Sequence, residues 1–317
     1  MDRSKNFSVM NLAKATHIKN GSSSSLIGLD FSSQNLDSEG ARLLASSLDQ
    51  VPFLAYLNIQ DNNIGPEGIN DIAVALNGIS RLVTLDISKN PIGNSGATNV
   101  SQSLQHLPFL SILNLESCQI TALGAAVIAS GIQWSAPCLT TLRANRNKLG
   151  ALGAQRLAEA LPYATCITSL DLSYSEIGLI GVQHIALSMR YLTCLRHLDI
   201  TGNITGPGGA EVLGQAARIG GASSLTSLRM GSNGLGPDGI CHLSSALRIG
   251  AIPRITDLEI ANNLLGPAGA TQLMPALRGT PNLARLGAAH NALGDLGARR
   301  LSAALSWLPG LRSADLR

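Results

Sequence analysis

The sequence predicts an α/β solenoid, a stack of strand–turn–helix units, from three observations. One pattern of apolar residues, asparagine and glycine restarts every 28–30 residues through nearly the whole chain. Each copy passes from an alternating to a helical spacing of apolar residues. One position carries glycine in every copy. The copies begin at Leu26, where the pattern is degenerate, and then at Leu54, Leu82, Leu110, Leu139, Ile167, Leu195, Leu225, Ile255 and Leu283.

The copy at Leu82 shows how one unit is built. Leu85 and Ile87 alternate with polar residues, which is the period of a short strand with one buried face. Further along, Val100 and Leu104 recur at helical spacing. Each unit is therefore expected to run strand, turn, helix and return loop.

An asparagine follows the strand in most copies. A chain that leaves a strand exposes unpaired backbone groups, which must be hydrogen-bonded if they are buried. An amide side chain both donates and accepts, so stacked asparagines can bond the turns above and below them. Two copies carry a smaller side chain here, and we expect weaker bonding there. The column comprises Gln34, Asn62, Asn90, Cys118, Asn147, Ser175, Asn203, Asn233, Asn263 and Asn291.

The glycine found in every copy predicts close packing between neighbouring units, because a position without a side chain allows close backbone approach. Parallel strands lie about 4.8 Å apart, whereas helix axes need about 8–10 Å. A stack with strands on one face and helices on the other must bend, so we expect the strands to line the inside of an arc. The glycines are Gly40, Gly68, Gly96, Gly124, Gly153, Gly181, Gly209, Gly239, Gly269 and Gly297.

These residues support a family resemblance. The 28-residue period and the motif N-x-L-G-x-x-G-A-x-x-L, from Leu26 to the C-terminus, resemble the ribonuclease-inhibitor-type leucine-rich repeats. The resemblance implies a horseshoe of about ten repeats, with parallel strands on the concave face and helices on the convex face. It does not imply one function, because this repeat class includes inhibitors, GTPase activators, receptor sensor regions and secreted bacterial effectors.

The period divides the chain into two parts. Residues 1–25 are basic and serine-rich and end in GSSSS, so we interpret them as a flexible tail, with a delivery or targeting segment as the alternative. Residues 26–317 form the repeat domain. Its last predicted strand, at 311–316, begins an incomplete eleventh repeat without a polar cap, and we expect self-association through that strand.

Composition limits the partners and the location. A net charge of +3 is too small to indicate nucleic acid. The chain has no run of about 18 apolar residues, so we expect no membrane partner. Five cysteines are an odd number, and a reducing compartment fits them best. We therefore expect a cytoplasmic protein, or, if the tail is a delivery segment, one secreted into the cytoplasm of a host cell.

The sequence offers no convincing catalytic constellation, and we expect neither an enzyme nor a cofactor. The phosphate-loop pattern G-x-x-x-x-G-K-[ST], the metal pattern H-E-x-x-H and the nucleophile pattern G-x-S-x-G do not occur. Cys138, Cys166 and Cys194 recur 28 residues apart. We read them as small apolar residues at a tolerant position rather than as a metal or redox site, because no histidine or acid recurs with them.

The inner strand face is the candidate site, because its outward side chains do not pack the core. Tyrosine and arginine are typical interface anchors, and they are densest together with acids around Arg143, Arg146, Asp171 and Tyr174. The alternative is that the sequence L-D-L-S is simply common in such repeats and that its aspartate is solvated. The candidate partner-binding residues are Tyr56, Asn58, Asp86, Arg143, Arg146, Asp171, Tyr174, His197, Asp199, Arg229, Glu259 and Arg285.

Basic residues also gather in the last third of the chain. We interpret them as ordinary solvated helix faces, and the alternative is a patch for an acidic partner. They are Arg218, Arg229, Arg248, Arg254, Arg278, Arg285, Arg299 and Arg300.

Three functions are compatible with these features. The first is a non-catalytic scaffold that binds a protein partner on the concave face, since a rigid arc offers much surface without an ordering cost. The second is the repeat part of a bacterial effector, for example of the ubiquitin-ligase type, with its catalytic domain elsewhere. The third is a regulator resembling the GTPase activators, although those typically carry a long acidic C-terminal region that this sequence lacks.

Overall fold

Short strands and helices alternate through the chain, as the sequence predicts. The computed structural model describes residues 16–19, 25–135 and 137–317, so most of the predicted 1–25 segment lies outside the described residues. The chain divides into two compact units, Met1–Lys148 (unit 1) and Leu149–Arg317 (unit 2), and each is described by itself.

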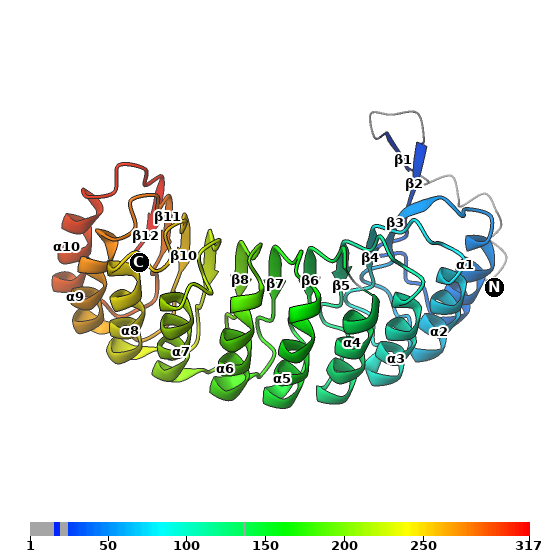
Figure 1. Cartoon of the computed structure of the whole chain (residues 1–317), viewed down its shortest axis with the longest axis horizontal. Coiled ribbons are helices and arrows are strands. Elements are labelled where there is room, and N and C mark those ends of the chain that lie inside the picture. The colour runs from blue at the N-terminus through cyan, green and yellow to red at the C-terminus, as the bar shows by residue number, and fades with distance from the viewer. Residues whose placement is uncertain (1–15, 20–24, 136) are drawn as a thin grey trace. The chain divides into compact units, whose positions relative to one another are not determined.

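In unit 1 the first strand runs antiparallel to the second, with Thr16 opposite Gly28. The later strands pair in parallel with the next one along the chain, as in the register of Tyr56 with Thr84. The elements (Figure 1) are β1 Thr16–Lys19, β2 Ser25–Asp30, α1 Ser38–Leu48, β3 Leu54–Asn58, α2 Pro66–Leu76, β4 Thr84–Asp86, α3 Gly93–Leu104, β5 Ile112–Asn114, α4 Ala122–Ser135 and β6 Thr141–Arg143.

In unit 2 the paired strands are parallel, with registers such as His197 opposite Ser227 and Asp257 opposite Arg285. Two single-turn 3₁₀ helices, which the sequence did not predict, extend α5 and α6. The elements are α5 Gly150–Ala160, η3 Leu161–Tyr163, β7 Ser169–Asp171, α6 Gly178–Ser188, η4 Met189–Tyr191, β8 His197–Asp199, α7 Gly206–Arg218, β9 Ser227–Arg229, α8 Gly236–Arg248, β10 Asp257–Glu259, α9 Gly266–Leu277, β11 Arg285–Gly287, α10 Gly294–Leu305 and β12 Ser313–Asp315.

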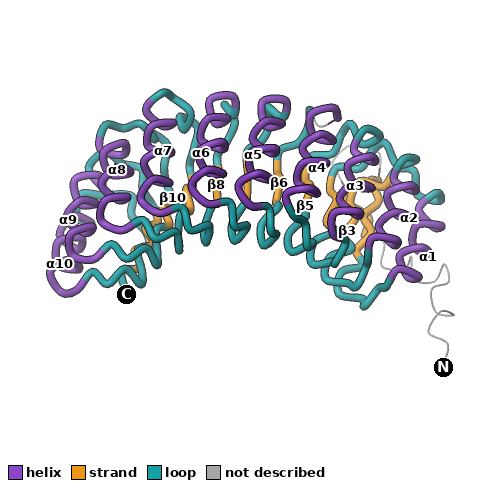
Figure 2. Tube along the Cα trace, turned by 90° about the horizontal axis from the view of Figure 1, so that it is seen from below, coloured by secondary structure: helices purple, strands orange, loops and turns teal. Residues whose placement is uncertain are grey.

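The core of each unit lies between a layer of strands and a layer of helices that stand side by side (Figure 2). In the second repeat Leu57 of β3 and Ile59 just after it are fully buried, and so are Ile69 and Ile72 of α2. The inward residues of each strand thus pack against the helix of the same repeat, which leaves the alternate strand residues on the opposite face. We call that opposite face the strand face.

The glycine predicted to permit close packing does so. A Cβ on Gly68 would lie 2.9 Å from the Cβ of Ala41 and 2.9 Å from the Cα of Ser38, both in the preceding helix. Real Cβ atoms do not approach other carbons that closely, so only glycine fits between α1 and α2 without a shift. The prolines near helix starts, among them Pro66 and Pro207, lie in the first turn of their helices, where the missing N–H costs no hydrogen bond.

Candidate functional site

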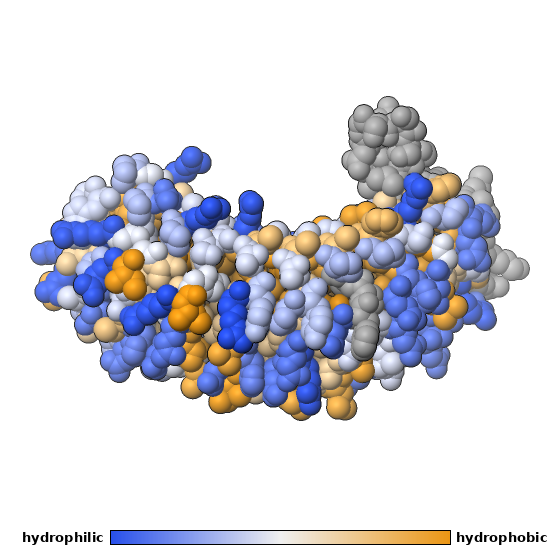
Figure 3. Space-filling view, viewed as in Figure 1, coloured by the Kyte–Doolittle hydropathy of each residue, from blue (hydrophilic) through white to orange (hydrophobic). Residues whose placement is uncertain are grey.

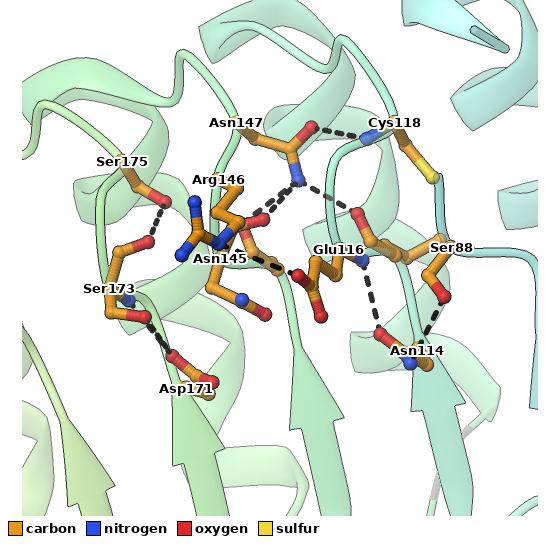
Figure 4. Close-up of polar contacts among 12 residues, drawn as sticks. Ser88, Asn114, Glu116, Cys118, Asn145, Arg146, Asn147, Asp171, Ser173 and Ser175 are labelled. Atoms are coloured by element: carbon orange, nitrogen blue, oxygen red, sulfur yellow. Dashed lines mark hydrogen bonds and ion pairs between the residues drawn. The ribbon is translucent and has the colours of Figure 1, made fainter. Parts of the chain in front are cut away.

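Buried asparagines hold the turns that follow the strands and thereby position the strand face. The Asn147 amide nitrogen donates to the backbone oxygens of Leu115 and Ala144 at 2.8 and 3.0 Å. Its oxygen accepts the backbone N–H group of Cys118 at 3.0 Å (Figure 4) and that of Ile120, also at 3.0 Å. The bonds reach the asparagine's own turn and the preceding repeat, whereas the sequence pattern predicts bonds to both neighbouring repeats. Each turn is therefore fixed by the asparagine of the next repeat.

Cys118 replaces one of these asparagines and keeps a single comparable bond. Its thiol donates to the backbone oxygen of Ile87 at 3.4 Å, where Asn147 uses an amide in the next repeat. Burial raises the pKa of the Cys118 thiol to about 12, in spite of a nearby backbone N–H from Asn90. The side chain is completely buried. Cys118 is therefore an inert structural thiol.

Thiol labelling checks this assignment. We expect four of the five cysteines to react with a soluble disulfide reagent at about pH 8 in the folded protein, because Cys138, Cys166, Cys194 and Cys241 are exposed. Cys118 should react only on unfolding, since at that pH it is both neutral and enclosed. The Cys118→Ala variant should lose only the slow reaction. Rapid labelling of all five thiols in the folded protein would contradict the assignment.

Most acidic side chains of the strand face form a hydrogen bond within their own repeat. The carboxylates of Asp86, Asp171 and Asp199 accept the backbone N–H two residues later, at 3.0, 3.0 and 2.9 Å. Asn58 and Glu259 make the same bond in their repeats. These side chains close the turn after the strand, which accounts for the recurring sequence pattern L-D-L-S. Asn58 is also buried and offers a partner little surface.

In unit 1 the predicted residues differ in their contacts and in their exposure. The Asn114 amide donates to Asp86 at 2.8 Å, which links two neighbouring strands. It also donates to the Ser88 hydroxyl at 3.3 Å (Figure 4). Arg143 is exposed at the end of β6, and the Arg146 guanidinium forms an ion pair with Glu116 at 3.5 Å. Tyr56 is half-buried, and its pKa is raised first by burial and then by the charge of Asp30. Glu116, which orients Arg146, is a residue that our candidate set lacks.

In unit 2 the structure brings two predicted arginines together through an aspartate. Asp257 accepts from Arg229 at 3.3 Å, faces Arg285 at 3.9 Å, and accepts from Ser227 at 3.0 Å. The side chain of Asp257 is 16% exposed, whereas those of Arg229 and Arg285 are 46% and 63% exposed. We call these three charged residues the arginine–aspartate cluster. Asp257 is not among the candidate partner-binding residues predicted from the sequence, although it has the same strand position as His197 and lies opposite Arg285 on the next strand.

Two glycines make room for predicted site residues in unit 2. The Tyr174 ring lies where a side chain on Gly202 would be, and the Glu259 carboxylate lies where one on Gly287 would be. Tyr174 itself has a positive φ of 52°, which places its exposed ring on the turn after β7. His197 is exposed and Asp199 is half-buried on the neighbouring strand. The site residues of unit 2 are therefore spread over successive repeats rather than gathered in one pocket.

Among the residues that the structure describes, no three His, Cys, Asp or Glu side chains gather closely enough to hold a metal ion. Within the same described part of the chain, no helix is both long and apolar enough to cross a membrane. Exposed guanidinium groups offer several donors in a fixed geometry that suits carboxylates.

One family profile agrees with the repeated architecture. The family profile described as Leucine Rich repeat matches residues 52–73, 81–101, 106–129, 163–186 and 221–240. No curated protein matches the chain. A crystal structure of an internalin from Listeria monocytogenes str. 4b F2365 shares 18% identity over 85% of this chain and 82% of the internalin chain, with a TM-score of 0.47. That resemblance says nothing of what this protein binds. With the repeated strand, turn and helix, the profile matches show a leucine-rich repeat α/β solenoid.

Proposed function

We propose that this leucine-rich repeat solenoid is a non-catalytic scaffold that binds a protein partner on its strand face. The observation that carries the proposal is the arginine–aspartate cluster: Asp257 on β10 holds Arg229 and Arg285 on the two flanking strands, β9 and β11, while both guanidinium groups stay exposed. The repeats of 28–30 residues and the helices of 11–14 residues support the ribonuclease-inhibitor-like type of leucine-rich repeat.

Rigidity supports a protein partner. The turns after the strands are fixed by buried asparagines, so their side chains need little ordering when a partner binds. Arginine, tyrosine and tryptophan dominate the binding energy of known interfaces, and the strand face exposes Arg143, Tyr174, Arg229 and Arg285. The acids that close the turns contribute local charge complementarity, whereas the arginines are the expected anchors.

A charge reversal tests the scaffold. We expect the Arg229→Glu, Arg285→Glu double variant to bind the partner at least about 10-fold more weakly, because two anchors are lost and Asp257 is left between two carboxylates. The partner would be captured with immobilised protein from a lysate of the protein's own cells, identified by mass spectrometry, and its affinity measured by calorimetry.

The matched control is Arg299→Glu with Arg300→Glu, which makes the same change of charge on exposed residues of α10. Circular dichroism would confirm that both variants keep the native helix content. Equal affinities for the strand-face variant and the control would refute the assignment of the site, and failure of the wild-type chain to capture any protein would refute the scaffold function.

A further inference from the structure

From the end of α6 onward, one edge of unit 2 carries positive charge only. We call it the return edge: the helix C-terminal ends and the loops that lead back to the next strand, at residues 187–196, 215–226, 245–256, 275–284 and 303–312. All charged residues in these segments are arginines. The nearest acid in α5, Glu159, is paired with Arg156 at 3.0 Å, and Asp257 belongs to the strand face.

Four of these arginines occupy the same place in successive repeats. Arg190, Arg218, Arg248 and Arg278 lie at or just beyond the ends of consecutive helices, and all are exposed. A cation at a helix C-terminus stabilises the helix dipole. In unit 1, however, the equivalent position carries no cation, and α1 and α2 end there in Asp49 and Asn77. The helices of this solenoid therefore form without the arginine, which points to a further role.

The return edge also exposes aliphatic side chains that the fold does not require. Ile219 and Ile249 follow two of the arginines and are 71% and 62% exposed. Each sits just before a glycine with positive φ, in a turn closed by bonds such as Gly220 N–H to the Ala217 oxygen and Gly221 N–H to the Ala216 oxygen. Ile219 has a φ of −92° and a ψ of 13°, a conformation that a small polar residue adopts equally well.

Aromatic rings complete the edge beside the arginines. The Arg190 guanidinium lies 4.7 Å from the centre of the Tyr191 ring, and that of Arg278 lies 4.1 Å from the centre of the Trp307 ring. Over the ends of α7 and α8, the space-filling view shows isolated hydrophobic side chains flanked by strongly hydrophilic ones (Figure 3). Arginine, tryptophan, tyrosine and exposed aliphatic side chains are the residues that anchor proteins at a lipid–water interface.

We propose that the return edge of unit 2 binds the surface of an anionic lipid bilayer. The arginines attract the headgroups, and Ile219 and Ile249 insert between them. The same Arg-Ile-Gly tripeptide at the same place in two neighbouring repeats suits a uniform, extended surface better than the irregular surface of one protein. Contact would be peripheral and does not need a spanning helix, so it differs from the membrane partner that hydropathy argues against. The return edge does not include the strand-face cluster, so this inference is independent of the proposed scaffold function.

Vesicle sedimentation tests the proposal. The wild-type chain should sediment with vesicles containing about one third phosphatidylserine in phosphatidylcholine, and not with pure phosphatidylcholine; added salt should release it. The Arg218→Gln, Arg248→Gln variant should bind about 25-fold more weakly, at about 5-fold for each arginine removed. The Ile219→Ser, Ile249→Ser variant should bind about 10-fold more weakly.

Two control variants match these changes elsewhere in unit 2. Arg299→Gln with Arg300→Gln removes the same charge from α10, and Ile204→Ser with Leu264→Ser removes exposed aliphatic side chains from turns that follow strands. Both should bind vesicles like the wild-type chain. The proposal is overturned if the wild-type protein does not bind the anionic vesicles, or if the controls lose as much binding as the return-edge variants. The wild-type chain could instead fail to bind vesicles but bind polyglutamate in a salt-sensitive manner. If the Arg218→Gln, Arg248→Gln variant lost that binding, the return edge would be assigned to an acidic polypeptide.

Discussion

Replacing Asn263 with alanine is expected to lower the free energy of unfolding by about 3–5 kcal/mol. The Asn263 amide nitrogen donates to the backbone oxygens of Met230 and Ile260, each at 2.9 Å. Its oxygen accepts the backbone N–H groups of Asn233 and Leu235, at 2.9 and 3.3 Å. The side chain is fully buried, so alanine leaves the N–H groups of Asn233 and Leu235 without this acceptor and without water. The Met230 and Ile260 oxygens each lose one of two asparagine donors, because they also accept from Asn233 and Asn291.

Denaturant unfolding followed by circular dichroism would measure this loss as a shift of the midpoint. Asn282→Ala is the matched control, because Asn282 is exposed and its amide makes one bond, to the Pro253 oxygen at 3.2 Å. We expect the control to change stability by less than about 0.5 kcal/mol. If Asn263→Ala behaved like the control, the column of buried asparagines would not be what stabilises the turns.

The Gly68→Ala variant is expected to lose about 2–3 kcal/mol, although alanine favours a helix over glycine by about 1 kcal/mol. The new methyl group would lie 2.9 Å from the Cα of Ser38, a backbone atom that cannot move without shifting α1, and 3.1 Å from the Cγ2 of Ile64. Overpacking between two helices therefore outweighs the gain in helix propensity.

The control for this variant is Gly78→Ala, just beyond α2. A Cβ on Gly78 meets nothing closer than the Ala75 oxygen at 3.6 Å, and we expect stability within about 0.5 kcal/mol of wild type. Thermal unfolding of both variants would separate the two sites. A stabilised Gly68→Ala protein would show that α1 and α2 do not approach each other as closely as described.

The fold could be predicted because the same pattern of residues recurs in each repeat. The alternation around Leu57, the turn asparagines and the constant glycine all depend on contacts between neighbouring repeats, which a period in the sequence makes visible. The candidate site was less accessible to such reasoning. The aspartates looked free for a partner, but Asp86 and Asp171 accept a backbone N–H two residues later, a bond that depends on the turn conformation.

The sequence by itself determined the repeat, its period and the residues that must face the core, because hydrophobic periodicity and stacking are local. Only the tertiary structure decided how the basic residues of the last third divide. It places Arg218 and Arg248 on the return edge, Arg229 and Arg285 beside Asp257 on the strand face, and others on α10. The reason is that a side chain's neighbours across repeats depend on where each helix ends and each strand begins. Amino-acid composition does not determine those positions.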